Sequence, residues 1–179
     1  MKEWMKTKEF MILMIVTAVF LIISIGNPTA FLTTGNIFDI VKSNLVLAIA
    51  AMGMLPIILT GGIDVSVGAL MGVASVMSAY FMIYVSDNIA LGFLAGALTG
   101  VLLGAINGAF IAFMKMPPIV ATLGTLSIYQ GLMNFITNGN WITNIPAGFV
   151  EFGKKYLFDL VPVQFIFLIV MVALTWWLL

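Results

Sequence analysis

One acidic residue, Asp64, stands between two long apolar runs and restricts how those runs can fold. The local sequence reads Leu59-Thr60-Gly61-Gly62-Ile63-Asp64-Val65-Ser66-Val67-Gly68, and the residues around it are nearly all apolar. A carboxylate at the centre of a bilayer costs about 2.5–3.5 kcal/mol on insertion scales, so this charge needs a polar setting. Asp64 must therefore lie either in a turn at the membrane surface or against a wet cavity lined by protein.

The glycine pair Gly61-Gly62 permits the sharp backbone bend that either setting requires. In one interpretation the bend is a simple turn, and Asp64 caps the N-terminus of the helix that follows. In the other, the bend interrupts a helix beside a solute pathway, and Pro56 weakens the helix just before it. The residues of the bend allow both interpretations.

The composition assigns the chain to the membrane. Of its 179 residues, 63% are hydrophobic and only 8% are charged, whereas soluble domains carry about 25% charged residues. We therefore expect an all-α integral membrane protein, a polytopic bundle of about six transmembrane or re-entrant helices forming one transmembrane domain over residues 1–179. The expected spans are 10–25, 45–59, 65–85, 89–114, 119–136 and 161–179, with an interfacial helix over 36–44 and a polar connection over 138–160.

Several function classes are excluded by what the sequence lacks. Cys and His are absent, which removes the usual ligands of zinc, haem and iron–sulfur sites and the base of His-dependent nucleophilic triads. The net charge of zero argues against nucleic acid as a partner. No phosphate-binding loop of the Gly-x-x-x-x-Gly-Lys type occurs, so energy from ATP must come through a partner. We expect no cofactor and no metal.

Glycines recur at every fourth position of the expected span 89–114. They are Gly92, Gly96, Gly100, Gly104 and Gly108. Small residues at this spacing let helix backbones approach closely. A step of four residues advances about 40° around an α-helix, so the stripe winds and can meet two neighbours. Asn107 is the polar exception in this helix.

The next span is preceded by Pro117-Pro118 and is less apolar than the others. Gln130 and Asn134 are four residues apart and should share a face, which either lines a pathway or bonds to another helix. The candidate pathway residues are Asp64, Ser66, Asn107, Thr122, Thr125, Gln130 and Asn134. Hydroxyl and amide groups suit a neutral polyol because they both donate and accept hydrogen bonds.

Orientation follows from the lysines. Placing the N-terminus in the cytoplasm puts Lys2, Lys6, Lys8 and Lys115 inside and leaves the other three outside. The first helix usually dominates, which also favours this arrangement. The Asp64 bend and the segment around Lys115 then lie towards the cytoplasm.

Several segments together resemble the ribose-type sugar permeases of ABC transporters, within the branched-chain and sugar permease superfamily. These segments are Asn36-Ile37, the bend 59–68, Asn107-Gly108, Pro117-Pro118-Ile119-Val120-Ala121-Thr122-Leu123-Gly124-Thr125, Gly131 and Thr137-Asn138-Gly139. They occur in the family's order and span nearly the whole chain.

The resemblance implies a multi-pass subunit of the bacterial inner membrane that imports a monosaccharide. The implied partners are a second permease, a cytoplasmic ATPase and an extracytoplasmic sugar-binding protein. Such permeases are roughly twice this length, so we expect the chain to be the N-terminal part of a larger permease, truncated at its C-terminus.

Two other functions fit parts of the sequence. A secondary transporter or a non-transporting scaffold fragment would need no ATPase, although no inverted repeat is evident. An intramembrane aspartyl protease would use the Asp64 bend, but its chemistry needs two close carboxylates. The remaining aspartates, Asp39, Asp87 and Asp159, all fall in expected surface connections.

Overall fold

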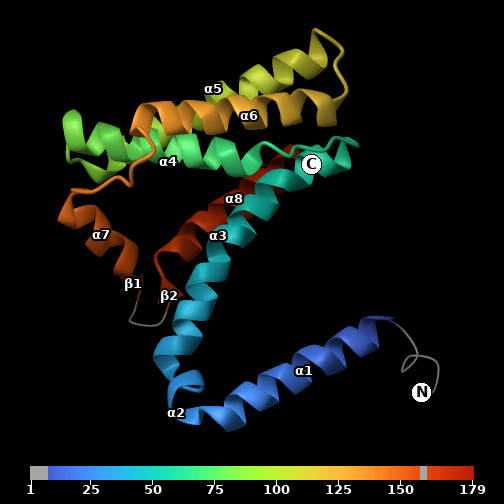
Figure 1. Cartoon of the computed structure of the whole chain (residues 1–179), viewed down its shortest axis with the longest axis vertical. Coiled ribbons are helices and arrows are strands. Elements are labelled where there is room, and N and C mark those ends of the chain that lie inside the picture. The colour runs from blue at the N-terminus through green and yellow to red at the C-terminus, as the bar shows by residue number, and fades with distance from the viewer. Residues whose placement is uncertain (1–7, 158–160) are drawn as a thin grey trace. The chain divides into compact units, whose positions relative to one another are not determined.

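The computed structural model describes residues 8–157 and 161–179 and is almost entirely helical (Figure 1). Its elements are α1 (Lys8–Gly26), α2 (Pro28–Phe31), α3 (Thr34–Leu59), α4 (Val67–Tyr84), α5 (Ile89–Ala112), α6 (Pro118–Thr137), α7 (Ala147–Lys154), β1 (Tyr156–Leu157), β2 (Val161–Pro162) and α8 (Gln164–Leu178). The two short strands pair antiparallel.

Five of the described helices, α1, α3, α4, α5 and α6, are long and apolar enough to cross a membrane. The apolar helix α8 has 15 residues, which corresponds to about 22 Å and is shorter than a hydrocarbon core of about 30 Å. The prediction of an all-α, polytopic membrane protein is confirmed.

The predicted boundaries are wrong in two places. Residues 36–44 form no separate interfacial helix, because α3 runs through them without a break. The polar side chains there bond within the helix: Ser43 Oγ donates to the Asp39 carbonyl and Asn44 Nδ2 to the Ile40 carbonyl, each at 2.8 Å. The last helix begins at Gln164, after β2, and not at 161, and the polar connection 138–160 contains α7 and β1.

The chain divides into two compact units at residues 46 and 47. In the first unit, α1 and α2 meet at the turn around Asn27. The rings of Phe20 and Phe31 lie edge to face with centroids 5.3 Å apart. Ser24 Oγ donates to the Phe20 carbonyl at 2.7 Å, so this hydroxyl is satisfied inside its own helix.

In the second unit, α4 packs against both α5 and α6 (Figure 1). The centre of this three-helix bundle holds the buried residues Ala69, Val73, Leu103 and Tyr129. Tyr80 of α4 also donates its hydroxyl proton to the Ile136 carbonyl of α6 at 3.1 Å. These contacts make α4 the helix that positions the other two.

The glycine stripe explains how closely α5 approaches α4. A Cβ on Gly92 would lie 2.5 Å from Cγ of Met82, and one on Gly96 would lie 3.3 Å from the Ala74 carbonyl oxygen. Further along α5, Gly100 only touches a leucine side chain, and a Cβ on Gly104 or Gly108 would meet nothing within 4 Å. The stripe therefore winds from the α4 contact into open space.

An aromatic cluster holds α7 and α8 beside the beginning of α5. The Phe93 ring lies 5.7 Å from Phe149 and 5.8 Å from Phe152 of α7, and 5.3 Å from Phe167 of α8. Edge-to-face and tilted ring pairs at these distances are favourable beyond the area they bury.

Candidate functional site

The bend before α4 begins with a Schellman motif at the end of α3. Gly62 donates its backbone N–H to the Ile57 carbonyl at 2.9 Å, and Gly61 donates to Ile58 at 3.0 Å. In this six-to-one and five-to-two pattern the donor of the shorter bond adopts the left-handed conformation. Gly61 occupies that position and has φ of +76°. A Cβ on Gly62 would lie only 3.2 Å from the Ile57 carbonyl oxygen. Each glycine is thus required for a different reason.

Asp64 organises the backbone that follows the glycines. Its Oδ1 accepts hydrogen bonds from Ser66 N at 2.8 Å and from Ser66 Oγ at 2.7 Å. The interpretation in which Asp64 caps α4 is therefore wrong in detail: Ser66 occupies the N-cap position of α4, and Asp64 closes a local turn just before it. Oδ2 of Asp64 makes no hydrogen bond to any residue that the structure describes.

A buried polar series connects this bend to α5 and α6. Asn107 Nδ2 donates to Ser66 Oγ at 2.8 Å, and the Tyr129 hydroxyl lies 3.1 Å from Asn107 Oδ1 and 2.8 Å from the Leu103 carbonyl. Because Ser66 gives its proton to a carboxylate, its oxygen can only accept from Asn107, and this fixes the orientation of the amide. Ser66, Tyr129 and Asn107 are only 0%, 3% and 4% exposed.

Thr122 fastens the same bend to the first turn of α6. Its Oγ1 accepts the backbone N–H of Val65 at 3.3 Å and, as a donor, lies 2.8 Å from the Pro118 carbonyl oxygen and 3.3 Å from that of Ile63. The extended residues 63–65 have no helix or strand partner, so this hydroxyl supplies a hydrogen bond that the backbone would otherwise lack.

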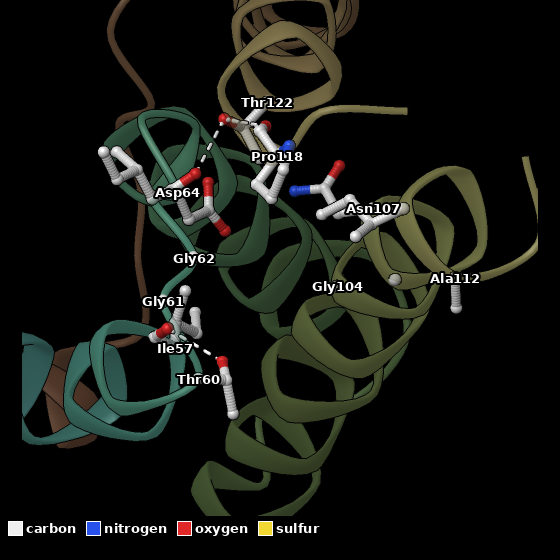
Figure 2. Close-up of a pocket in the computed structure, with 13 residues that line it drawn as sticks. Ile57, Thr60, Gly61, Gly62, Asp64, Gly104, Asn107, Ala112, Pro118 and Thr122 are labelled. Carbon is white, nitrogen blue, oxygen red and sulfur yellow. Dashed lines mark hydrogen bonds between the residues drawn. The ribbon is translucent and has the colours of Figure 1, made fainter. Parts of the chain in front are cut away.

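These elements enclose a cavity of about 530 Å³ between the bend, the end of α5 and the start of α6. Figure 2 shows the Asn107 amide pointing towards the bend that carries Asp64. We call this space the Asp64 cavity; its lining residues are Ile57, Thr60, Gly61, Gly62, Ile63, Asp64, Gly104, Asn107, Gly108, Ile111, Ala112, Pro118 and Thr122.

The volume and chemistry of the Asp64 cavity suit a small polar solute. Gly104 and Gly108, the open end of the glycine stripe, leave room that larger side chains would fill. Asp64 is the only charged residue among the lining residues, and it has no ion-pair partner in the described part of the chain. The site thus combines an apolar wall with a carboxylate, an amide and hydroxyl groups.

The seven candidate pathway residues separate into distinct places. Asp64, Asn107 and Thr122 line the Asp64 cavity. Ser66 is completely buried behind it, and Thr125 is buried between helices, where its hydroxyl donates to the Thr122 carbonyl at 3.3 Å. Asn134 lines a second cavity, whereas Gln130 is exposed and lines neither.

The candidate structural residues also differ in their surroundings. Pro56 lies inside α3, where its carbonyl accepts from Thr60 N at 3.1 Å. Pro117 occupies the N-cap position of α6 and Pro118 its first turn, where a missing N–H is tolerated. A Cβ on Gly68 would meet nothing within 4 Å.

The candidate pathway residues predicted from the sequence did not include Tyr129. A tyrosine in an apolar span is usually interpreted as packing, yet this hydroxyl anchors the buried polar series. A signal was available: positions 122, 125 and 129 are spaced to share one helix face, and two of them were already candidates.

Comparison with known proteins gives a consistent result. The family described as branched-chain amino acid transport system / permease component matches residues 36–179. The D-allose transport system permease protein AlsC of Escherichia coli K12 is 34% identical over 175 residues, 98% of this chain and 52% of AlsC. The autoinducer 2 import system permease protein LsrC of Yersinia enterocolitica is 34% identical over 135 residues, 75% of this chain and 37% of LsrC.

The chain thus spans about half the length of AlsC and less than two fifths of LsrC. No solved structure matches it significantly. The five spanning helices and the bacterial relatives identify a multi-pass protein of the bacterial inner membrane. With the match covering residues 36–179, the chain belongs to the branched-chain amino acid transport system / permease component family, and its relatives include a D-allose transport system permease and an autoinducer 2 import system permease.

Proposed function

We propose that the chain contributes to the solute pathway of an ABC importer for a neutral monosaccharide or a sugar-like molecule, and that the Asp64 cavity is part of that pathway. The observation that carries the proposal is the convergence of Asp64, Asn107 and Thr122, from three elements, on one cavity between membrane helices. The permease names of the relatives support the same assignment.

The chemistry of the cavity favours a polyol over an ion. The threonine hydroxyls donate to backbone carbonyls and keep a lone pair each, and the Asn107 amide keeps its second N–H, so these groups can accept from and donate to the hydroxyls of a sugar. Asp64 Oδ2 remains available to accept hydrogen bonds from a solute, and hydrogen bonds to a charged group contribute about 1.5–3 kcal/mol. Isoleucine and glycine walls leave room for the carbon skeleton.

The proposed partners are a cytoplasmic ATPase, a second permease subunit and an extracytoplasmic sugar-binding protein. The chain has no phosphate-binding loop, so we place ATP hydrolysis in the ATPase subunit and no catalysis in this chain. Transport would proceed by alternating access, with the sugar passing between two permeases. The permeases would lie in the lipid bilayer, and we propose no nucleic acid partner.

The names of the two relatives give D-allose and autoinducer 2 as their solutes. For this chain we propose only the class of monosaccharides and sugar-like molecules. Ribose is one member of that class and stays a prediction. A secondary transporter or a scaffold fragment has no observation in its favour here. An aspartyl protease would need a second carboxylate, and Asp64 is the only acidic residue among those lining its cavity.

The substitution Asp64→Asn tests the proposal because it removes the charge and keeps an oxygen that Ser66 can donate to. Replacing a charged acceptor by a neutral one costs about 1–1.5 kcal/mol, which corresponds to roughly tenfold in a rate or affinity. We therefore expect uptake of labelled sugar by the intact transporter to fall about tenfold, with unchanged amounts of protein in the membrane.

Asp87→Asn serves as the matched control, since Asp87 is exposed between α4 and α5 and lines neither cavity. Its uptake should equal that of the wild type. Normal uptake by Asp64→Asn would remove the carboxylate from the pathway, and an equal loss in both variants would point to a general effect of charge.

A further inference from the structure

We infer that a second cavity, on the other side of the buried core of the same three-helix bundle, is a separate binding site for a neutral monosaccharide. The inference rests on the proposed function, because it extends the solute class assigned to the Asp64 cavity. The second cavity has a volume of about 380 Å³ and includes Asn134, Asn140 and Trp141 in its lining; we call it the Asn134 cavity.

The two cavities are separated along the bundle. Thr122 lines the first and Met133 the second, and these residues are 11 positions apart on α6, about 16 Å along its axis. Between them lies the buried core with Val73 and Tyr129, and Met133 packs against that core. A solute in one cavity is therefore not in contact with the other.

Asn134 gives the second cavity its polar character. Its side chain is exposed and makes no hydrogen bond to any residue that the structure describes, so its donor and its acceptor are both open to a ligand. One amide offers both a donor and an acceptor, which matches two neighbouring hydroxyls of a sugar ring.

Trp141 supplies the second element of carbohydrate recognition. It lines the cavity with 94% of its surface exposed, so its broad ring is uncovered in the folded chain. An aromatic face packs well against the C–H face of a pyranose or furanose, while its edge N–H remains a donor. An exposed indole beside the unpaired Asn134 amide favours a polyol over a purely apolar ligand.

The backbone places Trp141 where it can act. Asn138 caps the C-terminus of α6 in the left-handed conformation with φ of 51°, and Gly139 follows with φ of 69°. Gly139 donates its N–H to the Asn134 carbonyl at 3.0 Å, which turns the chain back over the end of α6. In the orientation predicted from the lysines, this end faces outside, where a sugar would arrive.

Trp141 itself reports on the site. The chain has four tryptophans, so replacing Trp4, Trp176 and Trp177 by Phe leaves Trp141 as the only indole fluorophore. We expect a saturable change in its fluorescence when the purified protein in nanodiscs is titrated with D-allose or D-ribose, and none with L-leucine. A response to L-leucine alone, or to no solute, would overturn the inference.

Asn134→Leu should weaken the sugar titration at least fivefold, and Gln130→Leu is the matched control. Gln130 lies one turn away on the same helix and lines neither cavity, so its variant should bind as the parent does. If Asn134→Leu lowers the yield of folded protein, Asn134→Ala makes the same test. Equal binding by the Asn134 and Gln130 variants would remove Asn134 from the site.

The test distinguishes this site from the proposed function. Asp64→Asn should leave the Trp141 titration unchanged, because Asp64 lines the other cavity. A loss of uptake in Asp64→Asn without any Trp141 response would contradict only the second site. A Trp141 response to sugar, together with normal uptake in Asp64→Asn, would support the second site and contradict the role of the Asp64 cavity.

Discussion

Two substitutions in the glycine stripe of α5 separate the cost of close packing between helices from the gain in helix propensity when Ala replaces Gly. Gly92→Ala and Gly104→Ala make the same chemical change in the same helix, 12 residues apart. At Gly92 the new methyl group would lie 2.5 Å from Cγ and 2.6 Å from Sδ of Met82, which is only 3% exposed. At Gly104 it would meet nothing within 4 Å.

The magnitude follows from two terms. Adding a methyl group to a packed interface costs about 1–3 kcal/mol, and replacing Gly by Ala inside a helix returns about 0.8–1.0 kcal/mol. The propensity term is common to both variants and cancels in their difference. We therefore expect the free energy of unfolding of Gly92→Ala to be lower than that of Gly104→Ala by about 1–3 kcal/mol.

The assay is reversible unfolding of the purified protein in mixed micelles with increasing SDS, followed by far-UV circular dichroism. The wild type defines the reference, and Gly104→Ala should be equal to it or slightly more stable. Equal stability of the two variants would refute the close α4–α5 contact at Gly92. A larger loss at Gly104 would mean that a helix packs where the structure leaves a cavity.

Two further substitutions test the bend and the buried polar series. Asn107→Leu should lower the free energy of unfolding by about 1–3 kcal/mol, because it removes the donor to Ser66 Oγ and one of the two acceptors near the Tyr129 hydroxyl in a buried setting, while Ser66 keeps Asp64 and Tyr129 keeps the Leu103 carbonyl; SDS unfolding measures this, and a loss below 1 kcal/mol would contradict the series. Gly61→Ala should cost about 1–2 kcal/mol because its φ of +76° disfavours a Cβ, whereas Gly61→Asn should cost less; equal effects of the two variants would rule out the left-handed explanation.

Hydrophobicity alone was sufficient to predict most of the helices, because an apolar run must be helical when it spans a bilayer. It failed at residues 36–44, where Asp39 and Lys42 suggested an interface although α3 continues through them. The prediction did not consider that the polar side chains of Ser43 and Asn44 can donate hydrogen bonds to backbone carbonyls of their own helix.

The candidate site was predictable in its residue types but not in its grouping. Asp64, Asn107 and Thr122 stand out as polar groups in apolar surroundings, and the structure brings them to one cavity. The rotation of α6 is set by Thr122, Thr125 and Tyr129 facing the bundle. Gln130 and Asn134 share the opposite, exposed face, and of the two only Asn134 lines a cavity.

The Asp64 carboxylate also gives the polar series a direction. A carboxylate can only accept, so Ser66 has to donate to it, Asn107 has to present nitrogen to Ser66, and its oxygen is left for Tyr129. One carboxylate at the end of the series therefore sets the dipole orientation of groups on two neighbouring helices.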